Sequence, residues 1–320
     1  MRSDSLKLVD PQLRPYVEDT PPIRISADLI PAMREGFGPG LGLVEDEAAL
    51  AAVEADTVTL PGMPGEPDLN AVLHIPSGEA HARGAVLHLH GGGFVTGDPY
   101  ALIPLNRKIA HAADCVVLSL DYRLAPETPF PGALHDAYAA LTWLFSQAEE
   151  LGVDPSLIGV MGESAGGTLA AGLALMARDR GEYSLAFQHL TYPALDDRTG
   201  RSDETNPYSG DFVWTRESNR FVWDLWLGGK AGAEDVSPYA APARADALSG
   251  LPPTYLATAA LDLFVDENIR FAHRLIRSGV PTELQVFPGA FHAFQFVGVS
   301  DVGARSDKEG LAALQRFMAR

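Results

Sequence analysis

The sequence predicts an α/β protein in which a mostly parallel β-sheet is covered by helices on both faces. Short apolar runs rich in Val, Ile and Leu recur along the chain, as expected of strands that are buried on both sides. Segments of helical pattern separate these runs, and that alternation produces parallel sheets. No repeat with a period of 20–50 residues and no low-complexity tract interrupts it, which excludes solenoid architectures.

The first 50 residues are punctuated by proline and contain one helical patch at residues 25–34. We interpret the glycine-rich run 36–42 as a flexible connection, because no strand precedes it and Pro39 interrupts it. The alternation begins after Asp56. The strands expected from there are residues 57–60, 71–75, 84–89, 115–120, 157–161 and 187–192, with helices near 105–111, 133–148 and 168–178.

From Pro193 to about Pro252 the alternation stops. Three of the four Trp residues lie in this stretch, among proline and glycine turns. Aromatic residues crowded into an insertion between strands indicate either a lid with an apolar underside or a small satellite core under a long loop. The alternation then resumes. Strands are expected at 254–259 and 282–287, and helices at 266–278 and 308–318.

Composition excludes several classes of partner. The chain has 24 basic and 42 acidic residues, a net charge of −18, and such a surface repels nucleic acid and anionic lipid. Cys115 is the only cysteine, so no disulfide within the chain is expected, and its apolar strand context indicates an inert core residue. The N-terminal residues lack the apolar core of a signal peptide, and no stretch reaches about 18 apolar residues. We therefore expect a cytoplasmic protein without a membrane or nucleic-acid partner.

The strongest chemical signal is Gly162-Glu163-Ser164-Ala165-Gly166, which follows an apolar strand and precedes a helix. A serine on such a sharp turn has a strained backbone that lifts its hydroxyl clear of the sheet. The flanking glycines let neighbouring backbone pass close by. The pattern predicts that Ser164 is a nucleophile.

A serine nucleophile needs a base in contact with it and an acid that holds the base. In a parallel sheet these groups follow the carboxyl ends of strands. His292 comes five residues after the strand that ends at Phe287, and Asp262 comes three after the strand that ends at Ala259. The order Ser164, Asp262, His292 is the one expected of this kind of sheet. Asp266 and Glu267 are the alternative acids nearby, although Asp266 suits the first turn of a helix better.

The remaining requirement is a set of N–H donors for the oxyanion of the tetrahedral intermediate. Gly91, Gly92 and Gly93 follow an earlier strand and leave their N–H groups uncovered by side chains. Ala165, at the start of the nucleophile's helix, supplies a further donor. A phosphate loop is the alternative for the glycines, but no Lys-Ser/Thr follows them, which argues against nucleotide binding.

Taken together, three motifs resemble the hormone-sensitive lipase family of carboxylesterases, in its bacterial branch. The motifs are His90-Gly91-Gly92-Gly93-Phe94, Asp121-Tyr122-Arg123-Leu124-Ala125-Pro126-Glu127 and Gly162-Glu163-Ser164-Ala165-Gly166-Gly167, and the tail Leu248-Ser249-Gly250-Leu251-Pro252-Pro253 also resembles it. The likeness covers residues 55 to 320. Three positions depart from the family pattern: Glu163 replaces the more usual Asp, Leu263 a proline and Ala293 a glycine.

The resemblance implies an α/β-hydrolase fold with a mostly parallel eight-stranded sheet and a helical cap. We expect residues 1–50 to form the N-terminal part of the cap, 51–194 and 251–320 the two parts of the core, and 195–250 the cap insertion. It further implies that Arg123 and Glu127 brace the glycine loop, that no cofactor or metal is used, and that a homodimer forms through the edge of the last strand. The bonds Ala125–Pro126 and Phe130–Pro131 are candidates for the cis form.

The sequence therefore predicts a serine carboxylesterase acting on a small-molecule ester with a short or medium acyl chain. Phe94, Phe212 and Trp214 are the expected apolar walls of its substrate pocket. An amide, formamide or lactone hydrolase would use the same groups, and the motifs do not separate the leaving groups. A non-catalytic small-molecule receptor on this scaffold is a further alternative, although relatives with that role lack the histidine that is present here as His292.

Overall fold

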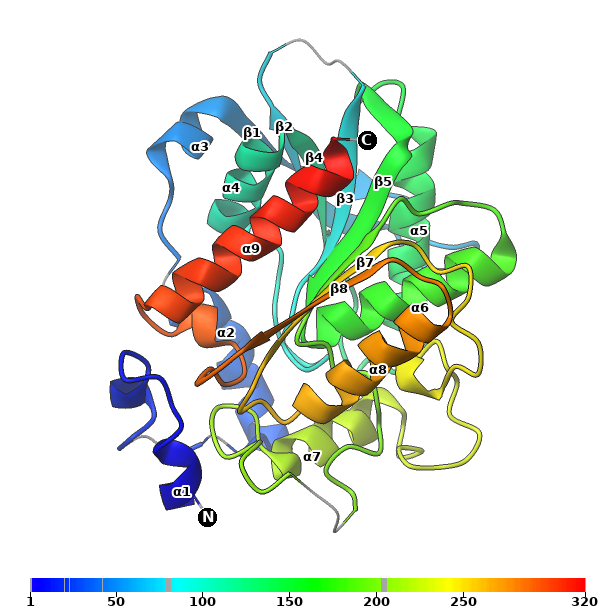
Figure 1. Cartoon of the computed structure of the whole chain (residues 1–320). Coiled ribbons are helices and arrows are strands. Elements are labelled where there is room, and N and C mark those ends of the chain that lie inside the picture. Colours follow the sequence, from blue (N-terminus) through cyan, green and yellow to red (C-terminus); the bar gives the residue numbers. More distant parts are fainter. Residues whose placement is uncertain are drawn as a thin grey trace.

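The alternating pattern folds into a single eight-stranded sheet with helices on both faces, as the computed structural model shows (Figure 1). The structure describes residues 2–19, 21–22, 24–41, 43–78, 82–202 and 206–319. The strands are β1 (Val53–Leu60), β2 (Leu69–Pro76), β3 (Arg83–Leu89), β4 (Cys115–Asp121), β5 (Val153–Glu163), β6 (Gln188–Thr191), β7 (Thr254–Ala259) and β8 (Thr282–Phe287).

The spatial order of the strands is β1-β2-β4-β3-β5-β6-β7-β8. β2 pairs antiparallel with β1 and β4, and every other neighbouring pair is parallel. In the central pair, Leu87 of β3 lies opposite Val160 of β5. The carboxyl ends of β3, β5, β7 and β8 therefore share one edge of the sheet, and the predicted active-site residues follow these four strands.

The helices are α1 (Arg2–Leu6), α2 (Ile30–Leu41), α3 (Glu47–Ala52), α4 (Ile103–Ala113), α5 (Gly132–Ser146), α6 (Ala165–Arg180), α7 (Arg216–Trp226), α8 (Val265–Arg277) and α9 (Asp301–Met318). α4 and α9 pack on one face of the sheet, whereas α5, α6 and α8 cover the other (Figure 1). Both faces of the parallel strands are consequently apolar, and β3, β4 and β7 are buried over almost their entire length.

Two expectations for helices are corrected by the structure. The glycine-rich run after residue 35 is not a connection, because α2 continues through it to Leu41, and Gly42 lies outside the described residues. The low helix propensity of the glycines does not end α2, and Arg34 in the preceding turn attaches this helix to the carbonyl oxygens of Val95 and Ala125. The last helix begins at Asp301 rather than near 308, with the Ser300 hydroxyl accepting from the N–H of Gly303 at 3.1 Å. Both Ala125–Pro126 and Phe130–Pro131 are cis, as predicted.

The N-terminal segment and the stretch between β6 and β7 contact each other. The Ser5 hydroxyl donates to the Asp211 carboxylate at 2.7 Å, and the N–H of Ile25 donates to the Ser218 hydroxyl at 3.1 Å. These contacts agree with one cap made from both segments, although the four domain boundaries remain a prediction. Among the described helices, none is both long and apolar enough to span a membrane.

Candidate active site

Ser164 lies at the sharp turn where β5 ends and α6 begins. Its backbone has φ 55° and ψ −120°, a conformation that is strained for any residue with a side chain. The turn is possible only because its neighbours are glycines. A Cβ on Gly166 would overlap the carbonyl oxygen of Leu89 in β3, and a Cβ on Gly162 would overlap the backbone of Gly166. The packing of β3 against this turn thus explains both glycines of the motif.

A continuous chain of hydrogen bonds joins the three residues predicted to be catalytic. The Ser164 hydroxyl donates to Nε2 of His292 at 2.9 Å, and Nδ1–H of His292 donates to Oδ2 of Asp262 at 2.7 Å. All three side chains are buried, at 6% exposure or less. Because water is largely excluded, the interaction between the carboxylate and an imidazolium would be strong.

Asp262 and Asp266 have different environments, although both follow β7. Asp262 is fully buried, and its second oxygen, Oδ1, accepts the N–H of Phe264 at 3.2 Å. Asp266 lies in the first turn of α8, where its contact is a 3.5 Å hydrogen bond from Asn206. The structure therefore brings Asp262, and not Asp266, to His292. Leu263, which stands where the family pattern has proline, does not prevent this geometry.

The glycine loop lies beside the nucleophile. A Cβ on Gly91 would lie 3.6 Å from Cβ of Ser164. Gly92 and Gly93 have φ values of 125° and 62°, which a residue with a side chain rarely adopts. Among the main-chain hydrogen bonds of the described residues, none uses the N–H of Gly92, Gly93 or Ala165. These N–H groups are therefore available to a ligand.

Arg34 of α2 attaches the N-terminal segment to this loop, a role that the sequence analysis did not find. Its guanidinium donates to the carbonyl oxygens of Val95 at 2.8 Å and Ala125 at 3.1 Å, and to the Glu127 carboxylate at 2.8 Å. Glu127 thus supports the glycine loop through Arg34. No sequence signal distinguishes Arg34 from other exposed arginines, since its partners are 61 or more residues away.

Arg123 has a different role from the one that the resemblance implied. Its guanidinium binds Asp136 of α5 at 2.5 Å and Glu66 at 2.6 Å. The main-chain N–H of Arg123 also donates to Asp136, at 2.9 Å. Arg123 therefore fixes the segment after β4 to α5 and to the turn between β1 and β2, rather than holding the glycines.

Trp214 covers the site from the side of the cap. Its ring centroid lies 5.7 Å from that of His292, and a Cβ on Gly93 would come within 2.5 Å of its Cη2 atom. The preceding residue, Val213, has φ 56°, and the N–H of Trp214 donates to the carbonyl of Phe212 at 2.6 Å. A three-residue turn of this hand is rare and strained, particularly at a β-branched residue. The indole N–H is fixed by Asn219 at 3.2 Å.

The other two predicted pocket residues pack more deeply. Phe94 is 2% exposed and stacks on Trp226 of α7, with the ring centroids 4.5 Å apart. Phe212 is 1% exposed and lies 5.9 Å from Phe291, the neighbour of His292. Their assignment to the walls of a substrate pocket remains a prediction. Trp223 and Trp226 of α7 are buried against Phe94 and belong to the same apolar cluster as the core of the sheet.

Two buried histidines support the turn and the loop around Ser164. His88 Nε2 donates to the Glu163 carboxylate at 3.0 Å, immediately before the nucleophile. His90 stacks on Tyr122 with the ring centroids 4.1 Å apart, and the Tyr122 hydroxyl donates to the His90 carbonyl at 2.7 Å. Burial lowers the pKa of His90 to about 4, so its imidazole is uncharged at neutral pH. Among the described residues, no three His, Cys, Asp or Glu side chains are grouped so that they could hold a metal ion.

Fold and site together define an α/β hydrolase. Residues 86–296 match the family described as "alpha/beta hydrolase fold", and the chain belongs to this family. It is 38% identical to Esterase LipI of Mycobacterium tuberculosis over 232 residues, which is 72% of each chain. It is also 38% identical to Carboxylesterase NlhH of the same species over 240 residues, 73% of each chain.

Solved structures agree with this assignment along nearly the full length. The chain superimposes on a bacterial heroin esterase with a TM-score of 0.89 and 37% identity, covering 98% of this chain and 99% of that one. The hyperthermophilic esterase of Pyrobaculum calidifontis gives a TM-score of 0.82 and 30% identity, covering 98% and 99%. The chain is therefore a carboxylic ester hydrolase of the bacterial group related to hormone-sensitive lipase.

Proposed function

We propose that this chain hydrolyses carboxylic esters with short or medium acyl chains, using Ser164 as the nucleophile, His292 as the base and Asp262 as the acid that holds the base. The observation that carries the proposal is the hydrogen-bonded chain from Ser164 Oγ through His292 to Asp262, at 2.9 and 2.7 Å. The three residues come from the carboxyl ends of three different strands, so the arrangement depends on the tertiary fold.

The first half of the reaction acylates the serine. Ser164 Oγ attacks the ester carbonyl carbon, and its proton passes to Nε2 of His292, while Asp262 stabilises the imidazolium that forms. The carbonyl oxygen becomes an oxyanion that accepts N–H hydrogen bonds from Gly92, Gly93 and Ala165. When the tetrahedral intermediate breaks down, the imidazolium gives its proton to the departing alcohol and the acyl group stays on Ser164.

Water reverses these roles in the second half. His292 takes a proton from water, which attacks the acyl carbon, and the carboxylate product leaves as Ser164 recovers its proton. In both halves Gly91 shapes the loop that presents the donors. Asp262 keeps its charge throughout and fixes the tautomer of His292 through the Nδ1–H bond.

The size of the acyl group is limited from the cap side. Trp214 packs on Gly93 and faces His292, and the Ser164 side chain is only 6% exposed. A bulky group beside the carbonyl would have to displace the indole, which Asn219 and the strained turn at Val213 hold in place. We therefore assign the wall next to the reacting carbonyl to Trp214.

The experiment that tests this proposal is a series of p-nitrophenyl esters of increasing acyl length, measured on the unaltered chain and on Ser164→Ala. The variant should lose about 10⁴- to 10⁶-fold in kcat, because the covalent step is removed. The matched control is Ser306→Ala, which removes an equally buried hydroxyl from α9 and should stay within twofold of the parent. Full activity in Ser164→Ala would exclude this serine as the nucleophile. A p-nitroanilide series with the same acyl groups tests amide hydrolysis.

A further inference from the structure

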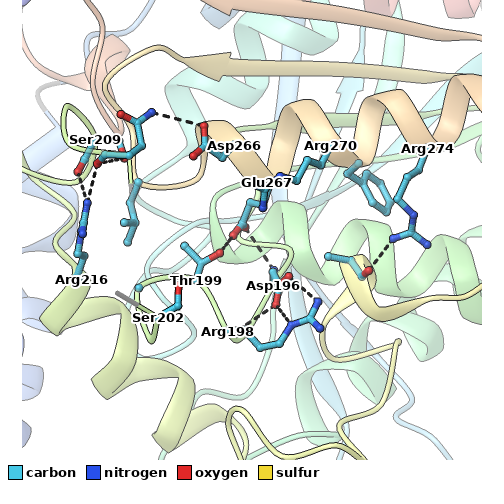
Figure 2. Close-up of a pocket in the computed structure, with 15 residues that line it drawn as sticks. Asp196, Arg198, Thr199, Ser202, Ser209, Arg216, Asp266, Glu267, Arg270 and Arg274 are labelled. Carbon is cyan, nitrogen blue, oxygen red and sulfur yellow. Dashed lines mark hydrogen bonds and ion pairs between the residues drawn. The ribbon is translucent and has the colours of Figure 1, made fainter. Parts of the chain in front are cut away.

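A cavity of about 410 Å³, whose lining does not include Ser164, Asp262 or His292, lies between α8 and the first part of the cap insertion. Four arginines line it, Arg198, Arg216, Arg270 and Arg274, together with Asp196, Asp266 and Glu267. Figure 2 shows Arg216 and Arg274 toward opposite ends of the cavity, with Asp266, Glu267 and Arg270 following one another along α8 between them. The catalytic mechanism uses none of these side chains.

The positive charges of this cavity are only partly balanced. Arg198 pairs with Asp196 at 2.7 Å. Arg216 donates to the carbonyl of Asn206 at 2.8 Å and Arg274 to that of Ala243 at 2.6 Å, and these carbonyls accept hydrogen bonds without supplying a negative charge. In the part of the chain that the structure describes, no carboxylate forms an ion pair with Arg216, Arg270 or Arg274.

The carboxyl groups of α8 offset little of this charge. Glu267 is 5% exposed and accepts the N–H of Leu195 at 2.5 Å, with Thr199 on its other oxygen. Burial raises the pKa of Glu267 well above its ordinary value, which favours the uncharged acid. Of the described carboxyl groups in the lining, Asp266 is the one that is neither buried nor paired with an arginine. Among the described residues that line the cavity, three guanidinium charges thus face one carboxylate, in a chain whose net charge is −18.

The lining also has an apolar part. Leu263, Phe271 and Ala243 line the same cavity. A small inorganic anion would leave these surfaces without a partner, whereas a carboxylate carrying an apolar tail could contact both parts. Guanidinium groups bind carboxylates through paired N–H donors.

We propose that this cavity is a second binding site, for organic monocarboxylates with a short apolar tail. The carboxylate is held by Arg270, whose guanidinium is exposed and makes no other described contact, within the field of Arg216 and Arg274. The tail lies toward Leu263 and Phe271. Because Leu263 directly follows Asp262, an occupant of the cavity would lie beside the loop that carries this residue. The site is separate from the Ser164 nucleophile and its existence does not depend on the reaction proposed above.

The test is calorimetric titration of the full chain with hexanoate, acetate, inorganic phosphate and hexanamide. Hexanoate should bind, and more tightly than the other three, since hexanamide lacks the charge, acetate the tail and phosphate both the planar carboxylate and the tail. Arg270→Gln should weaken hexanoate binding by about tenfold, the effect of one charge-assisted contact. Arg277→Gln is the matched control, because it removes the same charge from the last turn of α8 without touching the cavity, and it should change the affinity less than twofold.

Three results would overturn the proposal. Equal affinities of the Arg270 and Arg277 variants would place the ligand elsewhere, including at the catalytic serine. Hexanamide binding as tightly as hexanoate would remove the role of the guanidinium groups. Phosphate binding as tightly as hexanoate would reassign the cavity to small oxyanions. Since Arg270 is exposed and holds no other part of the fold, loss of binding in Arg270→Gln cannot be ascribed to misfolding, and circular dichroism checks this directly.

Discussion

The carboxyl edge of the sheet and the cap above it differ in how firmly the sequence determines them. Ser164, Asp262 and His292 follow the carboxyl ends of the parallel strands β5, β7 and β8 within five residues, so the strand order alone brings them together. Trp214, by contrast, is placed by a strained turn at Val213 within a long irregular stretch. Under the function proposed above, the reaction chemistry depends on the sheet and substrate selection on the cap, and the two can be altered separately.

The largest effect at the carboxyl edge of the sheet is expected from substitution of Asp262, the proposed acid. Asp262→Asn should lower kcat by at least about 10⁴-fold, because an amide cannot hold the same tautomer of His292 or stabilise its charged form. The structure makes Asp266→Asn a natural control, since this carboxylate lies in the first turn of α8 and contacts Asn206 instead. Its loss should cost less than tenfold. If Asp266→Asn proves the more damaging change in steady-state assays, Asp262 is not the acid.

A smaller effect, on selectivity rather than rate, is expected from the cap. Trp214→Ala should raise kcat/KM for p-nitrophenyl decanoate relative to the acetate by about tenfold, because the indole that limits the space beside Gly93 is removed. The ratio of the two values does not depend on the fraction of folded enzyme. Trp143→Ala, which removes a half-buried indole from α5, should leave the ratio unchanged. An unchanged ratio in the Trp214 variant would show that the acyl chain lies elsewhere.

Features that depend on local sequence patterns could be predicted, whereas features that depend on contacts between distant residues could not. The eight-stranded sheet is confirmed, and strands 254–259 and 282–287 were predicted with their observed limits. The apolar run of the buried strand β7 and the alternating pattern of β8, which is mostly half-buried, are both local in the sequence. The positions of Ser164, Asp262 and His292 were expected from strand ends and chain order. Arg34 was missed because its role depends on contacts with residues 61 to 93 positions away. The prediction of a flexible connection at residues 36–42 was wrong, because the sequence does not show the distant contacts of α2 either.

The cavity under α8 could not be predicted either. Its arginines are spread over residues 198 to 274 and look like ordinary surface charges in the sequence. What distinguishes them is that, of the three described carboxyl groups in the lining, Asp196 is paired and Glu267 is buried, which leaves Asp266 alone to offset the arginines. Pairing of this kind is a property of the tertiary structure, whereas the spacing of Gly162, Ser164 and Gly166 is a property of one turn.

Three buried histidines in or next to the sheet, His74, His90 and His189, should make the stability of the chain depend on pH. Burial lowers the pKa of His74, His90 and His189 to about 4, below the ordinary value of about 6.5. Between these values the unfolded chain binds more protons than the native one, so the free energy of unfolding should fall as the pH decreases from 6.5 toward 4. Chemical denaturation at several pH values measures this slope. His189→Gln should reduce it, while His273→Gln, an exposed change on α8, should not.

The smallest effect concerns the residue after the base. Ala293 has φ 60°, in the left-handed region that disfavours a side chain, which explains why the family pattern has glycine there. Ala293→Gly should therefore increase the free energy of unfolding by about 0.5–1 kcal/mol. Relief of the left-handed conformation, worth about 1–2 kcal/mol, is partly offset by the greater freedom of glycine in the unfolded chain, about 0.4–1 kcal/mol. Because the backbone already has the required shape, the distance between His292 and Ser164 should not change and kcat should stay within twofold. A less stable variant would mean that the methyl group of Ala293 contributes more by packing than its backbone strain costs.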